Sequence, residues 1–425
     1  MRIDINRSFF PSREITDSKW FAGRGAQIER ALKVLCDNGT SMLIYGDRGV
    51  GKSSFVEMVK QIASGNAELI YRLKMHNKYN PKYFKYKVIE LNCDEETDTI
   101  AKVLQRLITS PRGIKKLVSS KTEKTELLEK NGFGISFNFL RGDITNEEKI
   151  TKSTFVESSI YETFTNLIYQ IQDEILDESE ELLIVIDEFD RVKDTSKMGS
   201  LIKNLSKDKI KFIISGIASS YSELLKDHQS AYRQLLQGRI EINPMTDSEV
   251  NNVFDLVEEN TNKQLSFNKS FREEVFNLSQ GYPYFVQMCG QVALDYFTRI
   301  NSEQRGSINS SMLEKGLEYL MEYEPTLDDL YHEVVGDNKE KEIILRGIAK
   351  MVPKRVTRAS IIAYGQNQEI YNTKQIITTL LAFRSNGLTE GEIRVLETLG
   401  NDYILFSDTL FKIFCKVRKA LLVSN

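Results

Sequence analysis

The sequence predicts an α/β fold in which a parallel β-sheet carries helices on both faces, followed by a helical region and a smaller C-terminal domain. Two observations support this prediction. Short, continuously apolar segments alternate with amphipathic helical segments up to about residue 245, as is typical of parallel strands that are buried on both faces. After residue 246 strand patterns nearly disappear, which predicts that most of the remaining chain is helical.

The first domain is expected over residues 1–244. Its predicted helices cover residues 26–36, 53–62 and 154–176. Its predicted strands cover residues 41–45, 87–93, 182–186, 210–215 and 239–242. A charged stretch at about 111–154 interrupts the alternation, and the alternating apolar and polar residues of Gly132–Leu140 within it predict an inserted β-hairpin.

Two further domains are expected after this core. In the helical lid, over 245–336, Thr246 and Glu249 form a capping box that begins a helix. Further lid helices are predicted near 268–278, 283–300 and 308–322. The last domain, over 337–425, is predicted to contain helices near 340–351, 357–364 and 373–385, a hairpin through 393–398 and 403–407, and a final helix over 408–422.

The composition excludes several classes of protein. The net charge of −3 gives no general attraction to nucleic acid or to an anionic membrane, although a local basic face is compatible with it. The four cysteines are far apart and form no CxxC pair, which disfavours zinc and disulfide sites and favours a reducing cytoplasm. The three histidines form no cluster. Apolar runs are too short to span a membrane, so no membrane partner is expected.

A complete phosphate-binding loop (P-loop, or Walker A motif) lies between a predicted strand and a predicted helix. It fits G-x-x-x-x-G-K-[ST] at every fixed position. Glycines let the backbone N–H groups surround phosphates, a lysine reaches the β- and γ-phosphates, and a hydroxyl ligates Mg²⁺. The predicted ATP-binding residues are Gly46, Asp47, Arg48, Gly49, Val50, Gly51, Lys52, Ser53 and Ser54.

Two acids at the end of a buried strand supply the complementary Walker B half of an ATPase site. Asp187 follows the run Leu182–Ile186 and is predicted to join Ser53 in the Mg²⁺ shell. Glu188 is predicted to polarise the attacking water. Asp190 is interpreted as the cap of the next helix, in preference to a third metal ligand. The fold predicted on this basis is that of a P-loop NTPase.

Ser215 ends the predicted strand 210–215, and two interpretations of it remain open. Because the carboxyl ends of parallel strands meet at one edge of the sheet, its hydroxyl is placed to sense the γ-phosphate. The alternative is that Ser215 caps the following helix.

With these motifs in place, the chain resembles the AAA+ and STAND ATPases, near the archaeal and bacterial replication-initiator branch. The resemblance extends from Phe21-Ala22-Gly23-Arg24 to a winged-helix-like tail. It implies that Phe21, Gly23 and Arg24 lie at the adenine pocket, with a packing role as the alternative. The position of a glutamate that often follows the Gly-Arg pair in these proteins is Gln27 here.

The resemblance also implies an arginine that acts on the site of a neighbouring subunit. Arg233 and Arg239 occupy the available positions, and an ordinary surface role is the alternative for each. The lid arginine of many AAA+ proteins has no counterpart in Gly281–Gln291. Gly281-Tyr282-Pro283 is instead similar to the STAND pattern, in which the region around Pro283 senses nucleotide. This difference favours a slow switch over a fast motor.

Two functional hypotheses follow. The first is an ATP-binding and ATP-hydrolysing switch that forms homo-oligomers and recruits a separate effector protein; the resemblance makes antiviral defence one such role. The second is a DNA-binding loader or regulator of replication or transposition. Residues 337–425 carry 14 basic and 9 acidic residues, and the helix with Lys374 and Arg384 is the candidate DNA-contacting helix, with regulatory packing as the alternative. A nucleotide-stabilised scaffold is a third interpretation.

Overall fold

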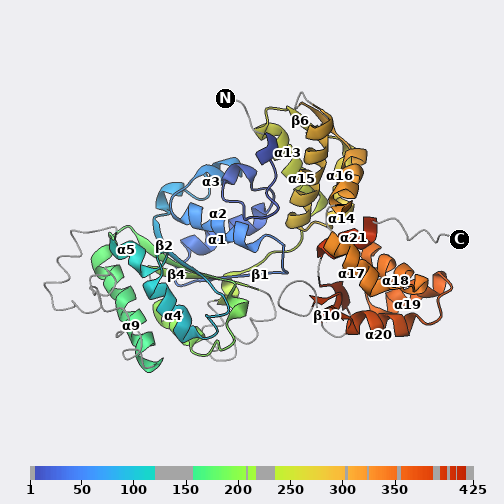
Figure 1. Ribbon diagram of the computed structural model, residues 1–425. Helices are drawn as coiled ribbons and strands as arrows, with labels where there is room; N and C mark the ends of the chain where they lie inside the picture. The colour runs from blue at the N-terminus through green and yellow to red at the C-terminus, as the bar shows by residue number, and fades with distance from the viewer. Residues whose placement is uncertain are drawn as a thin grey trace, which may run out of the picture. The chain divides into compact units, whose positions relative to one another are not determined.

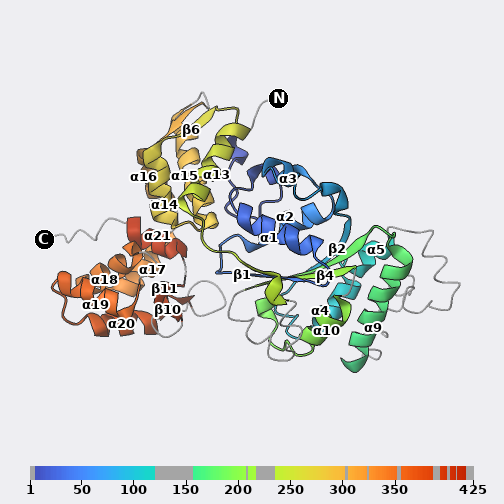
Figure 2. The ribbon, with the colours of Figure 1, turned by 180° about the vertical axis from the view of Figure 1, so that it is seen from behind.

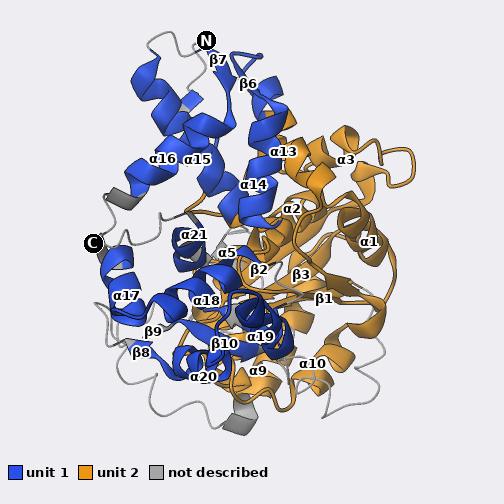
Figure 3. Cartoon of the chain, turned by 90° about the vertical axis from the view of Figure 1, so that its right-hand side faces the viewer, with its two compact units in different colours: residues 1–9, 257–280, 285–425 blue, residues 10–256, 281–284 orange. Residues whose placement is uncertain are grey.

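A computed structural model describes residues 5–119, 157–206, 209–216, 235–301, 305–322, 325–351, 356–385, 393–399, 403–407 and 409–417. The chain divides into two compact units (Figure 3). The sheet unit comprises residues 10–256 and 281–284, and the helical unit comprises residues 1–9, 257–280 and 285–425.

The sheet unit is built on five parallel strands, as the sequence predicts (Figure 1). The strands are β1 (Met42–Tyr45), β2 (Tyr86–Asn92), β3 (Glu181–Asp187), β4 (Ile210–Gly216) and β5 (Arg239–Glu241). Their order across the sheet is β2-β3-β4-β1-β5. Strand β4 therefore lies between β1 and β3, so the carboxyl end of β4 separates the ends of the two strands that carry the nucleotide motifs.

Helices cover both faces of this sheet, which confirms the predicted three-layer architecture (Figure 2). One face is packed by α1 (Gly25–Cys36), α2 (Lys52–Ala63) and α3 (Glu68–Arg72). The other face is packed by α4 (Ile100–Thr109), α5 (Ile114–Ser119), α9 (Glu157–Gln170) and α10 (Met198–Leu205).

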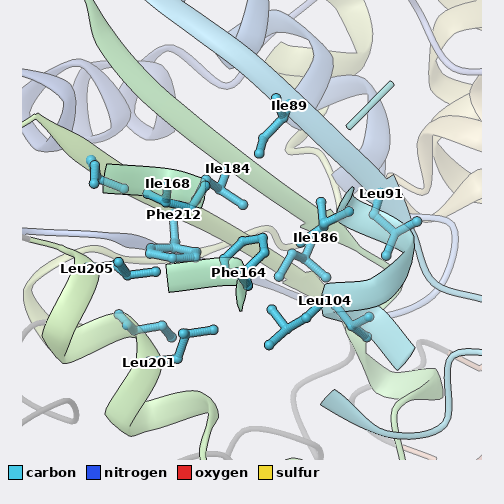
Figure 4. Packing of buried hydrophobic residues seen from close by; sticks show 14 of the residues in the cluster. Ile89, Leu91, Leu104, Phe164, Ile168, Ile184, Ile186, Leu201, Leu205 and Phe212 are labelled. Atoms are coloured by element: carbon cyan, nitrogen blue, oxygen red, sulfur yellow. The ribbon is translucent and has the colours of Figure 1, made fainter. Parts of the chain in front are cut away.

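The alternation of side chains along β3 divides the core into two halves. Leu183 and Val185 face the layer that contains α1 and α2, whereas Ile184 and Ile186 face the layer that contains α4 and α9. Figure 4 shows the second half, in which Phe164 of α9 lies among strand side chains. Because the strand is covered on both sides, every residue from 182 to 187 is buried, which explains the uninterrupted apolar run in the sequence.

The helix predicted over 154–176 corresponds to α9 and a π-helical turn at Ile171–Ile175. The predicted hairpin at Gly132–Leu140 lies outside the described residues. The predicted capping box is present, since the Thr246 hydroxyl accepts from the Glu249 N–H and the Glu249 carboxylate accepts from the Thr246 N–H. It begins α13 (Asp247–Asn260), whose first ten residues belong to the sheet unit.

The helical unit contains the three predicted lid helices as α14 (Lys269–Ser279), α15 (Pro283–Ile300) and α16 (Ser310–Glu322). The first two residues of α15 belong to the sheet unit and the rest to the helical unit. A parallel pair, β6 (Leu265–Phe267) with β7 (Gly306–Ile308), was not predicted. These strands have three residues each, too few for a recognisable period.

The C-terminal part of the helical unit follows the predicted order of helices and hairpin. Its helices are α17 (Pro325–Val335), α18 (Lys339–Lys350), α19 (Arg358–Asn367), α20 (Thr373–Ala382) and α21 (Thr409–Val417). The predicted hairpin is formed by β10 (Leu396–Leu399) and β11 (Tyr403–Phe406), and a second antiparallel pair joins β8 (Arg384–Ser385) to β9 (Ile393–Arg394). Helix α17 was not predicted from the sequence. Its Tyr331 is completely buried in the hydrophobic core of this C-terminal part. Within the described residues, no helix has both the length and the apolar character needed to cross a membrane.

Replacement of Phe164 by alanine tests the core in Figure 4. The side chain is completely buried, so its loss leaves a cavity and lowers the free energy of unfolding of the sheet unit by about 3–5 kcal/mol. Trp20, the single tryptophan of the chain, lies in the sheet unit and reports its urea unfolding by fluorescence. The control is Tyr169→Ala on the exposed face of the same helix, with an expected change below about 1 kcal/mol. Equal effects of the two substitutions would contradict the described packing.

Candidate active site

Three predicted parts of the site, the P-loop, Asp187 and Ser215, meet at the carboxyl edge of the sheet, within the sheet unit. The P-loop follows β1, Asp187 ends β3, and Ser215 lies in β4 between them. In the strand register Ile44 of β1 is opposite Ser215, and Asp187 is one residue beyond the pair of Ile186 with Ile214. Residues that are more than 130 positions apart in sequence are thus neighbours at this edge, where open parallel sheets bind ligands.

The backbone of the P-loop requires glycine at three positions for steric reasons. A Cβ on Gly46 would lie 2.1 Å from the carbonyl oxygen of Ile242, so no larger residue fits there. Gly49 and Gly51 have φ values of 79° and 90°, in the left-handed region that glycine adopts without strain. The loop can therefore turn sharply and direct backbone N–H groups toward a bound phosphate.

Lys52 is the first residue of α2, and its side chain folds back across the loop. The ammonium group donates to the carbonyl oxygens of Gly46 at 2.9 Å and Asp47 at 2.8 Å. Burial lowers the pKa of Lys52 below its ordinary value, while the carboxylates of Asp190 and Asp187 act against that lowering. A partly dehydrated cation at this position attracts phosphate more strongly than one in bulk water.

The two acids after β3 differ in environment. Asp187 is buried, and its Oδ1 accepts the Glu188 N–H at 2.9 Å. Glu188 has a left-handed φ of 52°, is half-exposed, and accepts a hydrogen bond from Arg191 Nε at 2.6 Å. The sequence analysis missed Arg191, although its i+3 spacing from Glu188 was visible. Asp187 is therefore held in place beside the P-loop, whereas the Glu188 side chain is held by an ion pair at the surface.

The hydroxyls of the site have different surroundings. Ser215 is completely buried, and its Oγ has no hydrogen-bond partner among the described residues. Ser53 is half-buried at the start of α2. Ser54, in contrast, accepts the Ile15 N–H at 3.0 Å, so its hydroxyl fastens the N-terminal segment to α2. A buried hydroxyl without a partner is costly in isolation, which makes Ser215 a position that a ligand or a water molecule would satisfy.

The segment before α1 is fastened to the P-loop through Arg24. The Arg24 side chain is buried and donates to the carbonyl oxygen of Val50 at 3.1 Å, while its backbone N–H donates to Glu249 Oε1 at 2.8 Å. Gly23 has a φ of 66°, and a Cβ there would lie 2.8 Å from Glu249 Cγ. Phe21 is buried in the core with α1 and α2, which favours the packing interpretation of its side chain. Glu249, missed as a site residue, is the acceptor that joins this segment to α13.

The start of α15 packs on the P-loop. The Tyr282 hydroxyl donates to Asp47 Oδ2 at 3.2 Å, and Pro283 Cγ lies 3.5 Å from where a Cβ on Gly51 would be. Gly281 fixes this arrangement, because its carbonyl oxygen accepts the Met245 N–H at 2.6 Å. Burial and the charge of Asp47 raise the pKa of Tyr282, so its hydroxyl remains protonated at neutral pH. Pro283 therefore lies beside the loop, and Tyr282 is an additional contact.

The remaining arginines are placed as follows. Arg239 donates from Nε to the Tyr45 hydroxyl at 2.7 Å, with its guanidinium 4.8 Å from the centre of the Tyr45 ring. This contact within its own chain would have to break before Arg239 could reach another subunit. Arg48 is exposed at the outer turn of the loop. Arg233 lies outside the described residues.

The arrangement has the parts that phosphoryl transfer to water requires. The loop glycines and Lys52 can bind phosphate oxygens, and Ser53 with Asp187 can complete an octahedral Mg²⁺ shell together with phosphates and water. Glu188 can accept a proton from an attacking water once it is released from Arg191. The unsatisfied Ser215 hydroxyl and the buried Asp187 carboxylate show that the polar groups present fit a nucleotide with its metal ion.

Residues 21–289 match the family model described as an ATPase domain predominantly from Archaea. This range covers more than half of the 425 residues and includes the P-loop, both acids and Pro283. A comparison with curated protein sequences gives no match.

Solved structures with a similar course of the chain include three archaeal proteins. A Walker-type ATPase of Pyrococcus abyssi has 14% identity over 95% of this chain and 99% of its own, with a TM-score of 0.46. The ORC1 protein of Aeropyrum pernix in complex with DNA has 12% identity over 97% and 95%, with a TM-score of 0.44. Cdc6p from Pyrobaculum aerophilum has 10% identity over 98% and 98%, with a TM-score of 0.43.

Glu249 makes the stability of the sheet unit depend on pH. Burial alone would raise the pKa of this carboxyl, but hydrogen bonds from the N–H groups of Arg24 and Thr246 outweigh it and lower the pKa. The resulting stabilisation is complete above the ordinary glutamate pKa of 4.5 and is lost as the pH falls through the lower value of the folded state. In the wild type, the urea concentration at the unfolding midpoint, measured by Trp20 fluorescence, should therefore fall below about pH 4.5. In Glu249→Gln this midpoint should fall less steeply with pH.

The matched control is Glu162→Gln, which replaces an exposed glutamate on α9 of the same unit. This variant should keep the wild-type decline. If Glu249→Gln also follows the wild-type curve throughout the acidic range, the carboxylate does not stabilise the fold in the way that its contacts indicate.

Proposed function

We propose that this chain, which belongs to the family of ATPase domains found predominantly in Archaea and is an ATPase, is an ATP-controlled assembly switch. Nucleotide at the P-loop would govern self-association and the recruitment of a separate effector protein, and hydrolysis would reset the protein. The observation that carries the proposal is the packing of Tyr282 and Pro283 on the P-loop.

This packing couples the P-loop, where the nucleotide binds, to the first turn of α15. Tyr282 contacts Asp47 and Pro283 lies against Gly51, so a phosphate that moves the loop also moves the first turn of α15. The same helix continues to Ile300 in the helical unit. Helix α15 therefore begins at the nucleotide site and ends in the other unit, so it can transmit a two-state change that follows the phosphate by which ATP and ADP differ.

In the proposed cycle each residue has a defined task. The loop N–H groups and Lys52 bind and orient the β- and γ-phosphates, and Ser53 and Asp187 hold the Mg²⁺ ion. That ion would offset phosphate charge when it is bound with the nucleotide. Glu188 exchanges its hydrogen bond from Arg191 for one from the attacking water. Because the Glu188–Arg191 ion pair is exposed, this exchange costs little free energy.

Ser215 is proposed as the sensor of the γ-phosphate. Its hydroxyl lies between the P-loop strand and the Asp187 strand and has no partner among the described residues. A hydroxyl engaged in capping a helix would already have a backbone partner. The contact with a γ-phosphate oxygen would therefore satisfy a group that the fold leaves unsatisfied.

The proposal keeps the STAND-like interpretation of the Gly281-Tyr282-Pro283 region and the three-domain division at residues 244 and 336. Self-association would let an arginine act on a neighbouring site, with Arg233 and Arg239 as the two candidates. No second catalytic group is assigned to this chain, so an effector protein would deliver the outcome, and a cytoplasmic role in antiviral defence is one setting in which such switches operate.

The second candidate is a DNA-binding loader or regulator. It is favoured by the net charge of +5 in residues 337–425 and by the helix–hairpin order that a winged helix would have. Under this hypothesis α20 enters a groove with Lys374 on its surface. ATP-dependent association in the absence of DNA favours the switch, whereas a salt-dependent duplex affinity that Lys374→Ala weakens favours the regulator.

The switch is tested by trapping the ATP-bound state. Glu188→Gln removes the proton acceptor and leaves the loop intact, so it should bind ATP normally and hydrolyse it at least about 100-fold more slowly. Mass photometry with ATP and Mg²⁺ should then show assemblies that persist longer than those of the wild type. Lys52→Ala should bind no ATP in calorimetry and should remain unassembled.

The control for the loss of a positive charge is Lys33→Ala, an exposed lysine on α1, which should behave as the wild type. Wild-type turnover in Glu188→Gln would contradict the catalytic assignment. Identical mass distributions with ATP, with ADP and without nucleotide would contradict the switch while leaving the ATPase activity untouched.

Ser215→Ala separates a sensing role from a structural one. Because the hydroxyl has no partner to lose, the urea midpoint should not fall, whereas kcat for ATP should drop by about tenfold or more if a γ-phosphate contact is lost. Ser41→Ala is the matched control. The Ser41 hydroxyl is also buried but bonds Ser206 and the Phe212 N–H, so its loss should lower stability and spare kcat. An unchanged kcat in Ser215→Ala would rule out sensing.

A further inference from the structure

The segment 69–89 of the sheet unit is one-sided in charge. It carries six basic residues and four tyrosines without a single acidic residue, although the whole chain has a net charge of −3. The segment runs from α3 through the 3₁₀ turn η3 (Pro81–Tyr83) into β2 (Figure 1). None of the roles assigned to the ATPase site uses it.

The fold holds this segment in a fixed shape. Leu69, Ile70, Tyr79, Phe84 and Tyr86 are buried in the core under α1 and α2. The turn η3 has Pro81 as its first residue, and Asn80 caps it by accepting the Lys82 N–H at 3.1 Å. Lys82 and Tyr83 are therefore presented to solvent by a rigid turn between buried anchors, and binding them would cost little ordering entropy.

The exposed side chains are cations and aromatic rings. Tyr83 is 76% exposed and Tyr71 is 56% exposed, both unusually high for tyrosine. Lys74, Lys82 and Lys85 are exposed beside them in the chain, and no described residue forms an ion pair with Lys74 or Lys82.

Other cations of the segment are already engaged. Lys78 pairs with Glu29 and Lys87 pairs with Glu180, while Lys85 donates to the Ser179 hydroxyl. The charge that remains for a partner therefore comes mainly from Lys74 and Lys82, on either side of the buried anchor Tyr79.

We propose that Tyr71, Lys74, Lys82 and Tyr83 form a binding surface for single-stranded nucleic acid, called here the tyrosine–lysine surface. The lysines bind backbone phosphates, and unpaired bases stack on the exposed rings, which is the chemistry that single-strand-binding proteins use. The Tyr71 ring lies 4.9 Å from the His76 ring and keeps 56% of its residue surface exposed for a base. An acidic peptide would use the lysines but would leave the exposed ring surfaces of Tyr71 and Tyr83 unused. Duplex DNA keeps its bases stacked internally, and the segment has no exposed aliphatic residues with which to enter a membrane.

The tyrosine–lysine surface is separate from the ATPase site. Tyr71, Lys74, Lys82 and Tyr83 all precede β2, on the segment that enters this edge strand at its amino end, whereas the P-loop and the acids follow the carboxyl ends of their strands. Variants on this surface leave the nucleotide-binding residues intact. It is also distinct from the α20 region of the second candidate function, which belongs to the helical unit.

The test is fluorescence anisotropy of the full chain with labelled oligonucleotides of about 20 residues, oligo(U) and oligo(dT), against a duplex of the same length. Binding to single strands is expected at about micromolar Kd and tighter than to the duplex. Comparison of the affinities for oligo(U) and oligo(dT) shows whether RNA or DNA is the preferred ligand. Tyr83→Ala should weaken single-strand binding by about tenfold. Lys74→Ala and Lys82→Ala should each reduce the salt slope by about 0.7.

Three controls accompany these variants. Tyr169→Ala removes an exposed tyrosine elsewhere in the sheet unit, Lys33→Ala removes an exposed lysine on α1, and Lys374→Ala reports on α20. All three should bind as the wild type, and circular dichroism should show every variant folded. The proposal is overturned by the absence of single-strand binding, by equal affinity for the duplex, by wild-type binding in Tyr83→Ala, or by a loss in Lys374→Ala alone.

Discussion

The contact of the Lys52 ammonium with two carbonyl oxygens of its own loop is the interaction on which the site depends. It closes the loop after β1 and places a partly buried cation beside the carboxylates of Asp187 and Asp190. A phosphate that binds in the loop can accept the hydrogen bonds that the Lys52 ammonium group donates to the two carbonyl oxygens. The surrounding glycines are constrained for the same reason, since the closed loop leaves no room for a side chain at Gly46 and needs left-handed backbone at Gly49 and Gly51.

Two segments far from the loop in sequence hold it from outside. Arg24 donates to the Val50 carbonyl oxygen and is itself fixed by Glu249, and Tyr282 donates to Asp47. Both contacts join the loop to the beginnings of helices that continue beyond the sheet unit, α13 and α15. A loop held in this way cannot change shape alone. This coupling is the physical basis for interpreting the protein as a switch, and it accounts for the constraint on Gly23, whose missing side chain makes room for Glu249.

The two edges of the sheet have different chemistry. At the carboxyl edge, the buried Asp187 carboxylate, the exposed Glu188 carboxylate, a buried hydroxyl and Lys52 suit a small, highly charged ligand with a metal ion. At the amino end of β2, exposed Tyr83 and Lys82 on a capped turn suit a long, flexible polyanion with flat bases. If both assignments hold, the chain senses nucleotide and polynucleotide at separate places, and linkage requires that any effect of one on the affinity for the other is reciprocal.

Hydrophobic period and glycine spacing are local properties of the chain, so the order of strands and helices in the core, the P-loop and the acids after β3 could be predicted from the sequence. The position of β4 between β1 and β3, which puts Ser215 at the site, is a property of the folded sheet. The tertiary fold also brings Glu249 to Arg24 across 225 residues, Tyr282 to Asp47 across 235, and Arg239 to Tyr45. Such pairs depend on strand order and on the packing of distant segments, and local periodicity contains neither.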